Sequence, residues 1–304
     1  MTLRLGIRTH FYDGSVDFVY NEWRKLLGDD VFLLVDETRG NVDVAGAPKI
    51  SWTESDSRAL GLPLTPVKKV PWHNGDYHMY HVRPHLREDD FCFLVEHDVF
   101  LKVADPNRLL TLLKTCAEYD FVAPRIGRRP PHWKWRKGLD LLYEDVRGAL
   151  VMMMGFNRRA ADYLFERRLA LQHKCTNSAT HEWPNVEAFV GSELFLAESL
   201  NIADMEILGG MTRKQIRTSP PFLMQDLMEN APADVIYHPC LPRDRFLRKL
   251  RPLFRFGQPS IGMWDALWPF VSTASEDEMK QLDRLSQQFW NTPSYMAAFS
   301  EAVS

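Results

Sequence analysis

The chain has 304 residues, of which 45% are hydrophobic and 25% are charged, and its formal net charge is −3. These proportions are typical of globular proteins and exclude disordered and fibrous classes. The small negative charge gives no support for a nucleic-acid partner, and no apolar stretch is long enough for a signal peptide or a membrane span, so we expect a cytoplasmic protein.

The first part of the chain alternates between strand and helix patterns. Residues 3–8 and 91–95 predict strands, and the apolar run 31–35 suits a strand that is covered on both faces. Between the first two strands of the chain, Ser15 is the predicted N-cap of a helix that stops at Gly28. This alternation predicts an α/β fold with a mostly parallel central sheet and helices on both faces.

The remaining predicted elements are less regular. Asp105 and Pro106 predict the start of a helix, because Asp is a good N-cap and Pro fits the first turn. Further strands are predicted at 120–124, 149–155, 204–208 and 234–237, and further helices at 54–60, 76–87, 157–171, 184–200, from Arg243, and from Ser275.

Polar residues follow the apolar runs at the ends of the predicted strands. They are Arg8-Thr9-His10, Asp36-Glu37-Thr38, Glu96-His97-Asp98 and the polar segment that begins at Pro124-Arg125. In an open parallel sheet, ligands bind outside the carboxyl ends of the strands, so these groups are the first candidates for a functional site.

Glu96 and Asp98 have the spacing of a metal site. They are two residues apart at a strand end, so in an extended chain both carboxylates project to the same side. Their mutual repulsion would be relieved by Mg²⁺ or Mn²⁺, which can also bridge to phosphates. The alternative is a solvated strand end with a helix-capping Asp. His238, held extended by Pro239, is either a structural residue or a further ligand.

A series of short motifs resembles GT-A glycosyltransferases. Glu96-His97-Asp98 matches the position of their DXD metal motif, with Glu in place of the first Asp, and the resemblance covers roughly residues 3–240. The other motifs are Arg8-Thr9-His10, Asp36-Glu37-Thr38, Trp72-His73-Asn74-Gly75-Asp76-Tyr77, Trp183-Pro184-Asn185-Val186-Glu187 and Tyr237-His238-Pro239. These pieces identify no sugar-specific family.

The resemblance implies a GT-A-like, Rossmann-like catalytic domain at 1–240 and a C-terminal helical extension at 241–304. Residues 1–124 would be its nucleotide-binding half and 125–240 its acceptor-binding half. It implies a metal-dependent transferase of the hexosyltransferase type, which moves a sugar from a UDP-sugar to a saccharide or other hydroxyl acceptor, with Mn²⁺ or Mg²⁺ as cofactor.

The resemblance also implies the site residues. Asp98 and His238 would bind the metal. The donor would be held by Arg8, Thr9, His10, Asp36, Asn74, Gly75, Asp76 and Glu96. Asp36 can accept from a ribose hydroxyl and Gly75 allows close backbone approach, whereas Asp76 can also serve as the N-cap of the following helix.

Two glutamates are candidates for the base that an inverting transfer needs. Glu187 and Glu193 lie six residues apart on one predicted helix, so they point in directions roughly 240° apart and cannot share a site. Glu187 is the first choice by resemblance, although it can also complement the helix dipole. Glu193 interrupts an apolar stretch, where a carboxylate needs a partner or a function.

Two other functions remain open at this stage. The same ligands could activate water in a metal-dependent phosphoesterase or nuclease, and the fold could belong to a non-catalytic nucleotide-sugar binder. The basic run from Arg243 to Arg255 is interleaved with apolar residues, so it predicts either a helix packed on the core or a peripheral contact with an anionic membrane.

Overall fold

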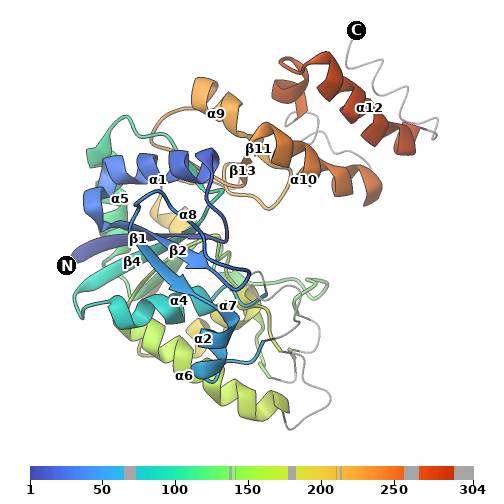
Figure 1. Cartoon of the computed structure of the whole chain (residues 1–304). Helices are drawn as coiled ribbons and strands as arrows, with labels where there is room; N and C mark the ends of the chain where they lie inside the picture. The colour runs from blue at the N-terminus through green and yellow to red at the C-terminus, as the bar shows by residue number, and fades with distance from the viewer. Residues whose placement is uncertain are drawn as a thin grey trace. The chain divides into compact units, whose positions relative to one another are not determined.

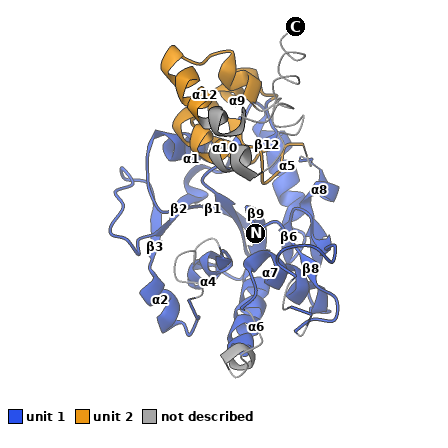
Figure 2. Cartoon of the chain, turned by 90° about the vertical axis from the view of Figure 1, so that its right-hand side faces the viewer, with its two compact units in different colours: residues 1–213, 233–236 blue, residues 214–232, 237–304 orange. Residues whose placement is uncertain are grey.

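The structure is a computed structural model that describes residues 1–64, 73–136, 139–140, 142–176, 183–209, 211–212, 214–256 and 267–290. Among the residues of the quoted motifs, Trp72 lies outside these ranges. The chain forms two compact units, residues 1–213 with 233–236 and residues 214–232 with 237–304 (Figure 2). The predicted boundary between residues 240 and 241 stays a prediction.

A seven-stranded sheet lies at the centre of the first unit (Figure 1). In spatial order its strands are β10 (Ile202–Asp204), β6 (Phe121–Ala123), β9 (Met153–Asn157), β4 (Asp90–Glu96), β1 (Thr2–Thr9), β2 (Val31–Asp36) and β3 (Lys49–Trp52). β1 is parallel to both β2 and β4, β3 is parallel to β2, and β10 is parallel to β6. β9 is antiparallel to β4 and β6. The predicted mostly parallel sheet is confirmed.

Helices cover both faces of this sheet (Figure 1). Phe32 and Leu34 of β2 pack in one core with α4 (Tyr77–Val82) and α6 (Arg158–Thr176), whereas Leu33 is equally buried but lies outside that core, as expected for alternate residues of a strand. On the other face, α1 (Gly14–Leu27) packs on β1 and β2 and also contacts α5 (Pro106–Cys116). Among the described residues of the unit, the α-helices are α1 (Gly14–Leu27), α2 (Glu54–Ala59), α4 (Tyr77–Val82), α5 (Pro106–Cys116), α6 (Arg158–Thr176), α7 (Val186–Leu196) and α8 (Met205–Leu208).

Short elements complete the first unit. They are η1 (Gly28–Asp30), η2 (Arg83–His85), β5 (Phe100–Leu101), β7 (Gly127–Arg128) and β8 (Arg147–Gly148), while β12 (Ile236–Tyr237) spans the boundary to the second unit.

Two of the predicted helix ends are confirmed, whereas one predicted cap and one predicted strand are wrong. Asp105 caps α5 as predicted, by accepting from the amide of Asn107, and Gly28 ends α1 with a φ of 60°. The predicted cap at Ser15 is wrong, because the carboxylate of Asp13 accepts from the amides of Ser15 and Val16 and starts α1 earlier. The predicted strand 204–208 is also wrong.

In that segment, the strand β10 ends at Asp204 and a short helix follows it. The side chain of Asp204 accepts from the amide of Glu206 and so caps α8. A short apolar run is compatible with either a strand or a helix, and here the cap at Asp204 favours the helix.

The second unit has a hydrophobic core of its own. Leu223, Phe246, Leu250, Phe270 and Leu282 are buried in it. The part of this unit that the structure describes includes β11 (Phe222–Leu223), α9 (Met224–Asn230), β13 (Cys240–Leu241), α10 (Arg243–Phe256) and α12 (Glu276–Trp290).

The capping box predicted at Ser275 is confirmed. The amide of Ser275 donates to the Glu278 carboxylate at 2.8 Å, and the amide of Glu278 donates to the Ser275 hydroxyl at 3.3 Å. In α10, Phe246 and Leu250 are buried within the unit, whereas Arg248 and Lys249 are exposed. The helix packed on the core therefore describes this part of the basic run better than an apolar face that inserts into a membrane.

Candidate functional site

The carboxyl ends of β1, β2 and β4 meet at one edge of the sheet. Arg8 pairs in register with Glu96, and Thr9 pairs with Val35, the residue before Asp36. The parallel register thus brings together three of the polar strand ends that the sequence selects.

Arg8 is a buried cation at this edge, with 4% of its side chain exposed. Its guanidinium donates to Oε1 of Glu96 at 3.4 Å, to the carbonyl of Gly75 at 3.3 Å, and to the carbonyl of Val151. Burial lowers the pKa of Arg8, while the charges of Glu96, Asp98 and Asp76 act to raise it. Arg8 therefore offsets the repulsion between the acidic groups of this edge.

Glu96 and Asp98 lie in a turn whose backbone is fixed by hydrogen bonds. The amide of Glu96 donates to the carbonyl of Met152 at 2.8 Å, and the amide of Val99 donates back to the carbonyl of Glu96 at 2.9 Å. Both carboxylates are partly exposed. Two carboxylates at the end of one strand offer oxygen ligands that could hold a divalent metal ion.

His238 belongs to the second unit, where its ring orientation is set locally. Its Nδ1 lies 2.8 Å from the carbonyl oxygen of Arg217. Because a carbonyl oxygen only accepts, Nδ1 carries the hydrogen, so Nε2 is the ring nitrogen that could act as a ligand. The role of His238 as a ligand stays a prediction.

The other strand-end residues shape their own turns. The hydroxyl of Thr9 donates to the carbonyl of Phe11 at 2.6 Å, and the carboxylate of Asp36 accepts from the amide of Thr38 at 3.0 Å. His10 is exposed and lies edge-on to His97, with ring centroids 6.2 Å apart.

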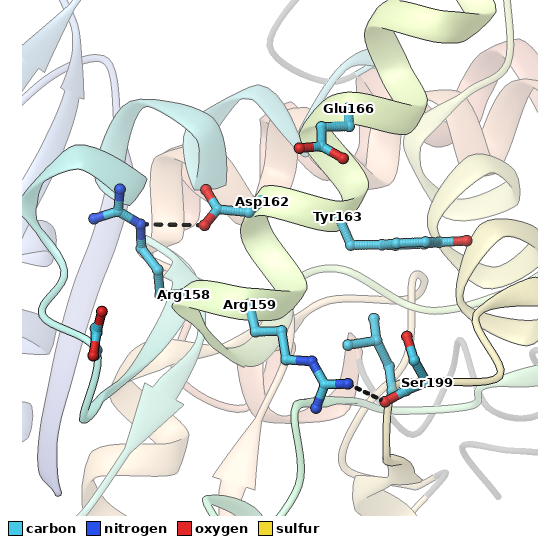
Figure 3. A pocket seen from close by; sticks show the side chains of 8 residues that line it. Arg158, Arg159, Asp162, Tyr163, Glu166 and Ser199 are labelled. Carbon is cyan, nitrogen blue, oxygen red and sulfur yellow. Dashed lines mark hydrogen bonds and ion pairs between the residues drawn. The ribbon is translucent and has the colours of Figure 1, made fainter.

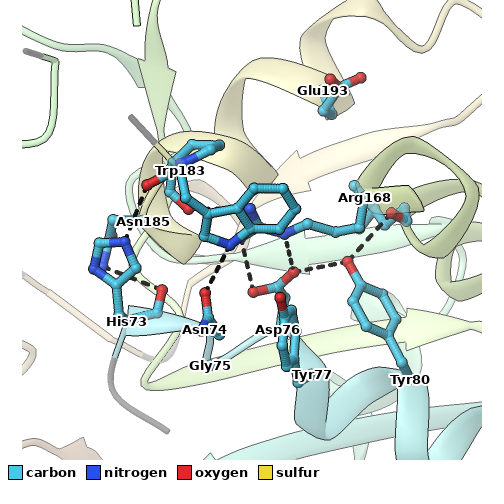
Figure 4. Close-up of polar contacts among 12 residues, drawn as sticks. His73, Asn74, Gly75, Asp76, Tyr77, Tyr80, Arg168, Trp183, Asn185 and Glu193 are labelled. Carbon is cyan, nitrogen blue, oxygen red and sulfur yellow. Dashed lines mark hydrogen bonds and ion pairs between the residues drawn. The ribbon is translucent and has the colours of Figure 1, made fainter. Parts of the chain in front are cut away.

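The predicted donor segment Asn74–Asp76 is buried and bonded within the protein (Figure 4). The side-chain oxygen of Asn74 accepts from the indole of Trp183 at 3.0 Å. Asp76 has no exposed surface and makes no side-chain cap to α4, so its predicted role as a side-chain N-cap is wrong. Its carboxylate instead accepts from Arg168 at 2.6 and 3.0 Å. Direct contact of Asn74 or Asp76 with a donor stays a prediction.

The two candidate bases on α7 lie in different surroundings, as their spacing predicts. Glu193 is 1% exposed and accepts from the hydroxyl of Tyr143 at 2.8 Å and from Arg167 at 2.7 Å. Glu187 is only partly buried. Glu193 therefore has the partners that a buried carboxylate needs, and its role as a base stays a prediction.

The environment of Glu187 favours its neutral form. Burial raises the pKa of Glu187 to about 7, against the opposing effects of Arg129, Lys134 and a hydrogen bond from Trp135. The charge of Glu96 also acts to raise it. Glu187 therefore lies within electrostatic reach of the sheet edge, and its carboxyl group exchanges a proton near neutral pH.

Arg168 is the residue that sequence reasoning missed. It has no exposed surface, and it lies on the stripe of α6 that also buries Ala161, Leu164 and Leu171. This spacing of three, four and three residues is the signal, because a charge on a buried helical stripe requires a partner.

A pocket of about 470 Å³ lies elsewhere on the first unit (Figure 3). It is lined by Glu88, Arg158, Arg159, Asp162, Tyr163, Glu166, Ser199 and Leu200. Glu88 precedes β4, and Leu200 precedes β10, so the pocket lies by the amino ends of parallel strands. Ligands of open α/β sheets bind at the opposite edge, so this pocket is separate from the candidate site.

No protein-family model matches the sequence. No curated protein matches it either. Among the described residues, none of the helices is both long and apolar enough to cross a membrane.

Three solved structures that resemble the chain are glycosyltransferases. A galactosyltransferase, LgtC, in complex with donor and acceptor sugar analogues has a TM-score of 0.38 and 9% identity, and the match covers 75% of this chain and 78% of LgtC. A glycosyltransferase involved in glycosylation of the major capsid of PBCV-1 has a TM-score of 0.38 and 9% identity, with 82% and 98% covered. Mouse xyloside xylosyltransferase 1 has a TM-score of 0.37 and 10% identity, with 78% and 97% covered. Likenesses at this level carry no conclusion about substrate or mechanism, which we infer from the residues.

Proposed function

We propose that the protein is a glycosyltransferase that moves a sugar from a UDP-sugar to an acceptor hydroxyl and depends on Mn²⁺ or Mg²⁺. The observation that carries the proposal is that two carboxylates suited to a metal ion and one carboxylate with a raised pKa lie within electrostatic reach of one another. Glu96 and Asp98 are partly exposed beside the buried cation Arg8, whereas Glu187 on α7 is partly buried and within electrostatic reach of Glu96.

Glu96 and Asp98 would hold the metal ion, with His238 as the further ligand that the sequence predicts. Carboxylate oxygens and a neutral imidazole suit Mn²⁺ well, and oxygens suit Mg²⁺. When bound, a divalent ion would stabilise the negative charge that develops on the departing nucleotide diphosphate. Arg8 would hold Glu96 in place through its hydrogen bond of 3.4 Å.

The donor would lie along the ends of β1 and β2. Thr9, His10 and Asp36 would border its nucleoside, and Asp36 would accept from a ribose hydroxyl with an oxygen directed away from Thr38. Gly75 would permit close backbone approach. Asn74 and Asp76 would affect the donor only indirectly, because their side chains already form hydrogen bonds with Trp183 and Arg168.

Glu187 would take the proton from the acceptor hydroxyl. A pKa of about 7 suits a general base at neutral pH, since the group is partly ionised and still binds a proton well. The acceptor would therefore lie beside the first turn of α7, and Lys134 and Arg129 would favour the ionised form of the base.

The test is a transfer assay preceded by a thermal-shift screen of nucleoside diphosphates with Mn²⁺ and with EDTA. We expect stabilisation by UDP that requires Mn²⁺, followed by UDP release and a sugar-sized mass increase in a panel of acceptors. Asp98→Ala should abolish the stabilisation, whereas Glu88→Ala, in the pocket by the opposite edge, should leave it intact.

Two outcomes would contradict the proposal in different ways. Hydrolysis of a simple phosphodiester without sugar transfer would identify a phosphoesterase or nuclease. Metal-dependent binding of UDP-sugars without turnover across the acceptor panel would identify a non-catalytic binder.

A further inference from the structure

We propose that Arg168 is a positioning residue, whose buried guanidinium fixes the first turn of α7, and with it Glu187, against the segment His73–Asp76. The inference rests on the proposed function, in which Glu187 is the base and this segment borders the donor. Figure 4 shows Arg168 together with Asp76, Tyr80, Trp183 and Asn185.

The first half of the connection is a fully buried ion pair. Arg168 and Asp76 both have no exposed surface. Nε of Arg168 donates to Oδ2 of Asp76 at 2.6 Å, and Nη2 donates to Oδ1 at 3.0 Å. Tyr80 donates its hydroxyl hydrogen to the same carboxylate at 2.8 Å. Asp76 is thereby held in one orientation, and the backbone of its segment is held with it.

The second half connects the same guanidinium to the start of α7. Nη1 of Arg168 donates to the carbonyl of Pro184 at 3.0 Å, and the guanidinium lies 3.7 Å from the ring centroid of Phe189. Between these two residues, Asn185 caps α7 by accepting from the amide of Glu187 at 2.9 Å. The position of Pro184 therefore sets the cap, and the cap sets the backbone of Glu187.

Neutral hydrogen bonds join the same two segments alongside Arg168. Trp183 donates to Asn74 at 3.0 Å, and a ring nitrogen of His73 lies 3.1 Å from the carbonyl oxygen of Trp183. The guanidinium lies 5.0 Å from the ring centroid of Trp183, so it packs within this set of contacts.

Only a guanidinium meets these demands together. Its planar fork directs Nε and Nη2 to the Asp76 carboxylate while Nη1 points to the carbonyl of Pro184. A lysine ammonium is a compact charge on a flexible stem and cannot keep this bidentate geometry and the second contact. Arg168→Lys therefore retains the buried charge and removes the geometry.

Arg83→Lys is the matched control. Like Arg168, Arg83 contacts both a carboxylate and an aromatic ring. Its guanidinium lies 3.3 Å from the carboxylate of Asp162 and 4.1 Å from the ring centroid of Phe165, and both of these residues belong to α6. Neither His73–Asp76 nor Pro184 is among its partners in the contacts of the described residues. It therefore reports the general effect of replacing an arginine that bridges to this helix.

The experiment compares the parent, Arg168→Lys and Arg83→Lys by hydrogen–deuterium exchange and by steady-state kinetics on the full chain. For Arg168→Lys we expect faster exchange confined to peptides that cover residues 73–80 and 183–190. We also expect kcat to fall about 100-fold, because a displaced base slows chemistry, with a smaller rise in the KM of the donor, because the loosened segment His73–Asp76 borders the donor. Arg83→Lys should show neither effect.

Unchanged exchange in both peptides of a folded Arg168→Lys variant would overturn the inference. So would faster exchange spread evenly over the whole unit, which a merely structural residue would produce. Should Arg168→Lys not fold, Tyr80→Phe removes the hydroxyl that contacts Asp76 at 2.8 Å and the carbonyl of Leu164 at 3.2 Å, and it keeps Arg168 in place. It should give the same local pattern at smaller amplitude, and the absence of that pattern would also overturn the inference. If the parent shows no transfer, the proposed function fails while the exchange pattern still decides the role of Arg168.

Discussion

Tyr143 donates its hydroxyl hydrogen to Oε1 of Glu193 at 2.8 Å. Arg167 donates to the other carboxylate oxygen at 2.7 Å, and Glu193 is 1% exposed. A buried carboxylate that accepts from two donors is satisfied within the protein, so these hydrogen bonds suffice to explain the charge that interrupts the apolar stretch of α7.

Glu193→Ala should therefore lower the free energy of unfolding by about 2 kcal/mol, because it leaves the hydroxyl of the buried Tyr143 without its acceptor. Urea unfolding followed by circular dichroism measures this. Glu198→Ala is the control, since Glu198 is exposed just beyond α7 and should change stability by less than about 0.5 kcal/mol. Equal effects of the two substitutions would contradict the structural role of Glu193.

Gly191→Ala tests the close approach of α7 to β8. A Cβ at Gly191 would lie 2.5 Å from the Cα and carbonyl carbon of Gly148, so the two backbones would have to move apart. We expect a loss of about 1–3 kcal/mol despite the better helix propensity of Ala. Gly14→Ala is the control, because nothing lies within 4 Å of the Cβ it would add at the start of α1. A neutral Gly191→Ala would mean that this contact is looser than described.

The strand ends were predictable from the sequence because they depend on local patterns. Apolar runs that stop at Arg8, Asp36 and Glu96 indicate both the strands and their carboxyl ends, and parallel pairing brings such ends to one edge. The donor set for a metal follows from residue types alone. What these patterns leave open is which side chains are already occupied by other parts of the protein.

Asp76 is an example of a side chain whose partner the local sequence does not reveal. The sequence offers it as a helix cap or a donor contact, but its partner Arg168 is 92 positions away and comes from another helix. No local pattern gives that pairing. Likewise, the spacing of Glu187 and Glu193 separates their directions, yet only the packed structure shows that Tyr143 and Arg167 occupy Glu193 while Glu187 is left partly exposed.

Asp98→Ala should abolish metal-dependent binding of UDP without unfolding the protein, because its carboxylate lies in a partly exposed turn rather than in the core. At a UDP concentration of about 100 times the Kd, the parent should gain about 2.7 kcal/mol with Mn²⁺ and the variant almost nothing. Glu96→Ala should have a milder effect. Equal affinity of the parent and Asp98→Ala for UDP with Mn²⁺ would refute the metal assignment.

The raised pKa of Glu187 predicts how stability depends on pH. The pKa rises from 4.5 to about 7 on folding, so between these values the folded state binds the proton more tightly than the unfolded state. The stabilisation is fully present below the unfolded pKa and is lost as pH rises through the folded pKa, by at most about 3 kcal/mol. Urea unfolding from pH 4.5 to 8 should show this fall in the parent, and the difference from Glu187→Gln should vary with pH. A constant difference would rule out the shifted pKa.

Glu187→Gln should also separate chemistry from donor binding. The amide keeps the shape of the side chain but cannot take a proton, so an inverting transferase should lose about 10²- to 10⁴-fold in kcat while its affinity for UDP with Mn²⁺ stays close to that of the parent. In the parent, kcat/KM should rise with pH and reach half its maximum near pH 7, the pKa that burial gives the Glu187 carboxyl.

Glu193→Gln is the matched variant on the same helix. Because the carboxylate of Glu193 is bonded to Tyr143 and Arg167, this substitution should lower stability more than turnover. Normal turnover of Glu187→Gln with a collapse in Glu193→Gln, at unchanged folding and UDP affinity, would reverse the assignment. Normal turnover in both variants would remove α7 as the source of the base and favour a retaining reaction, in which the leaving phosphate itself can assist the acceptor.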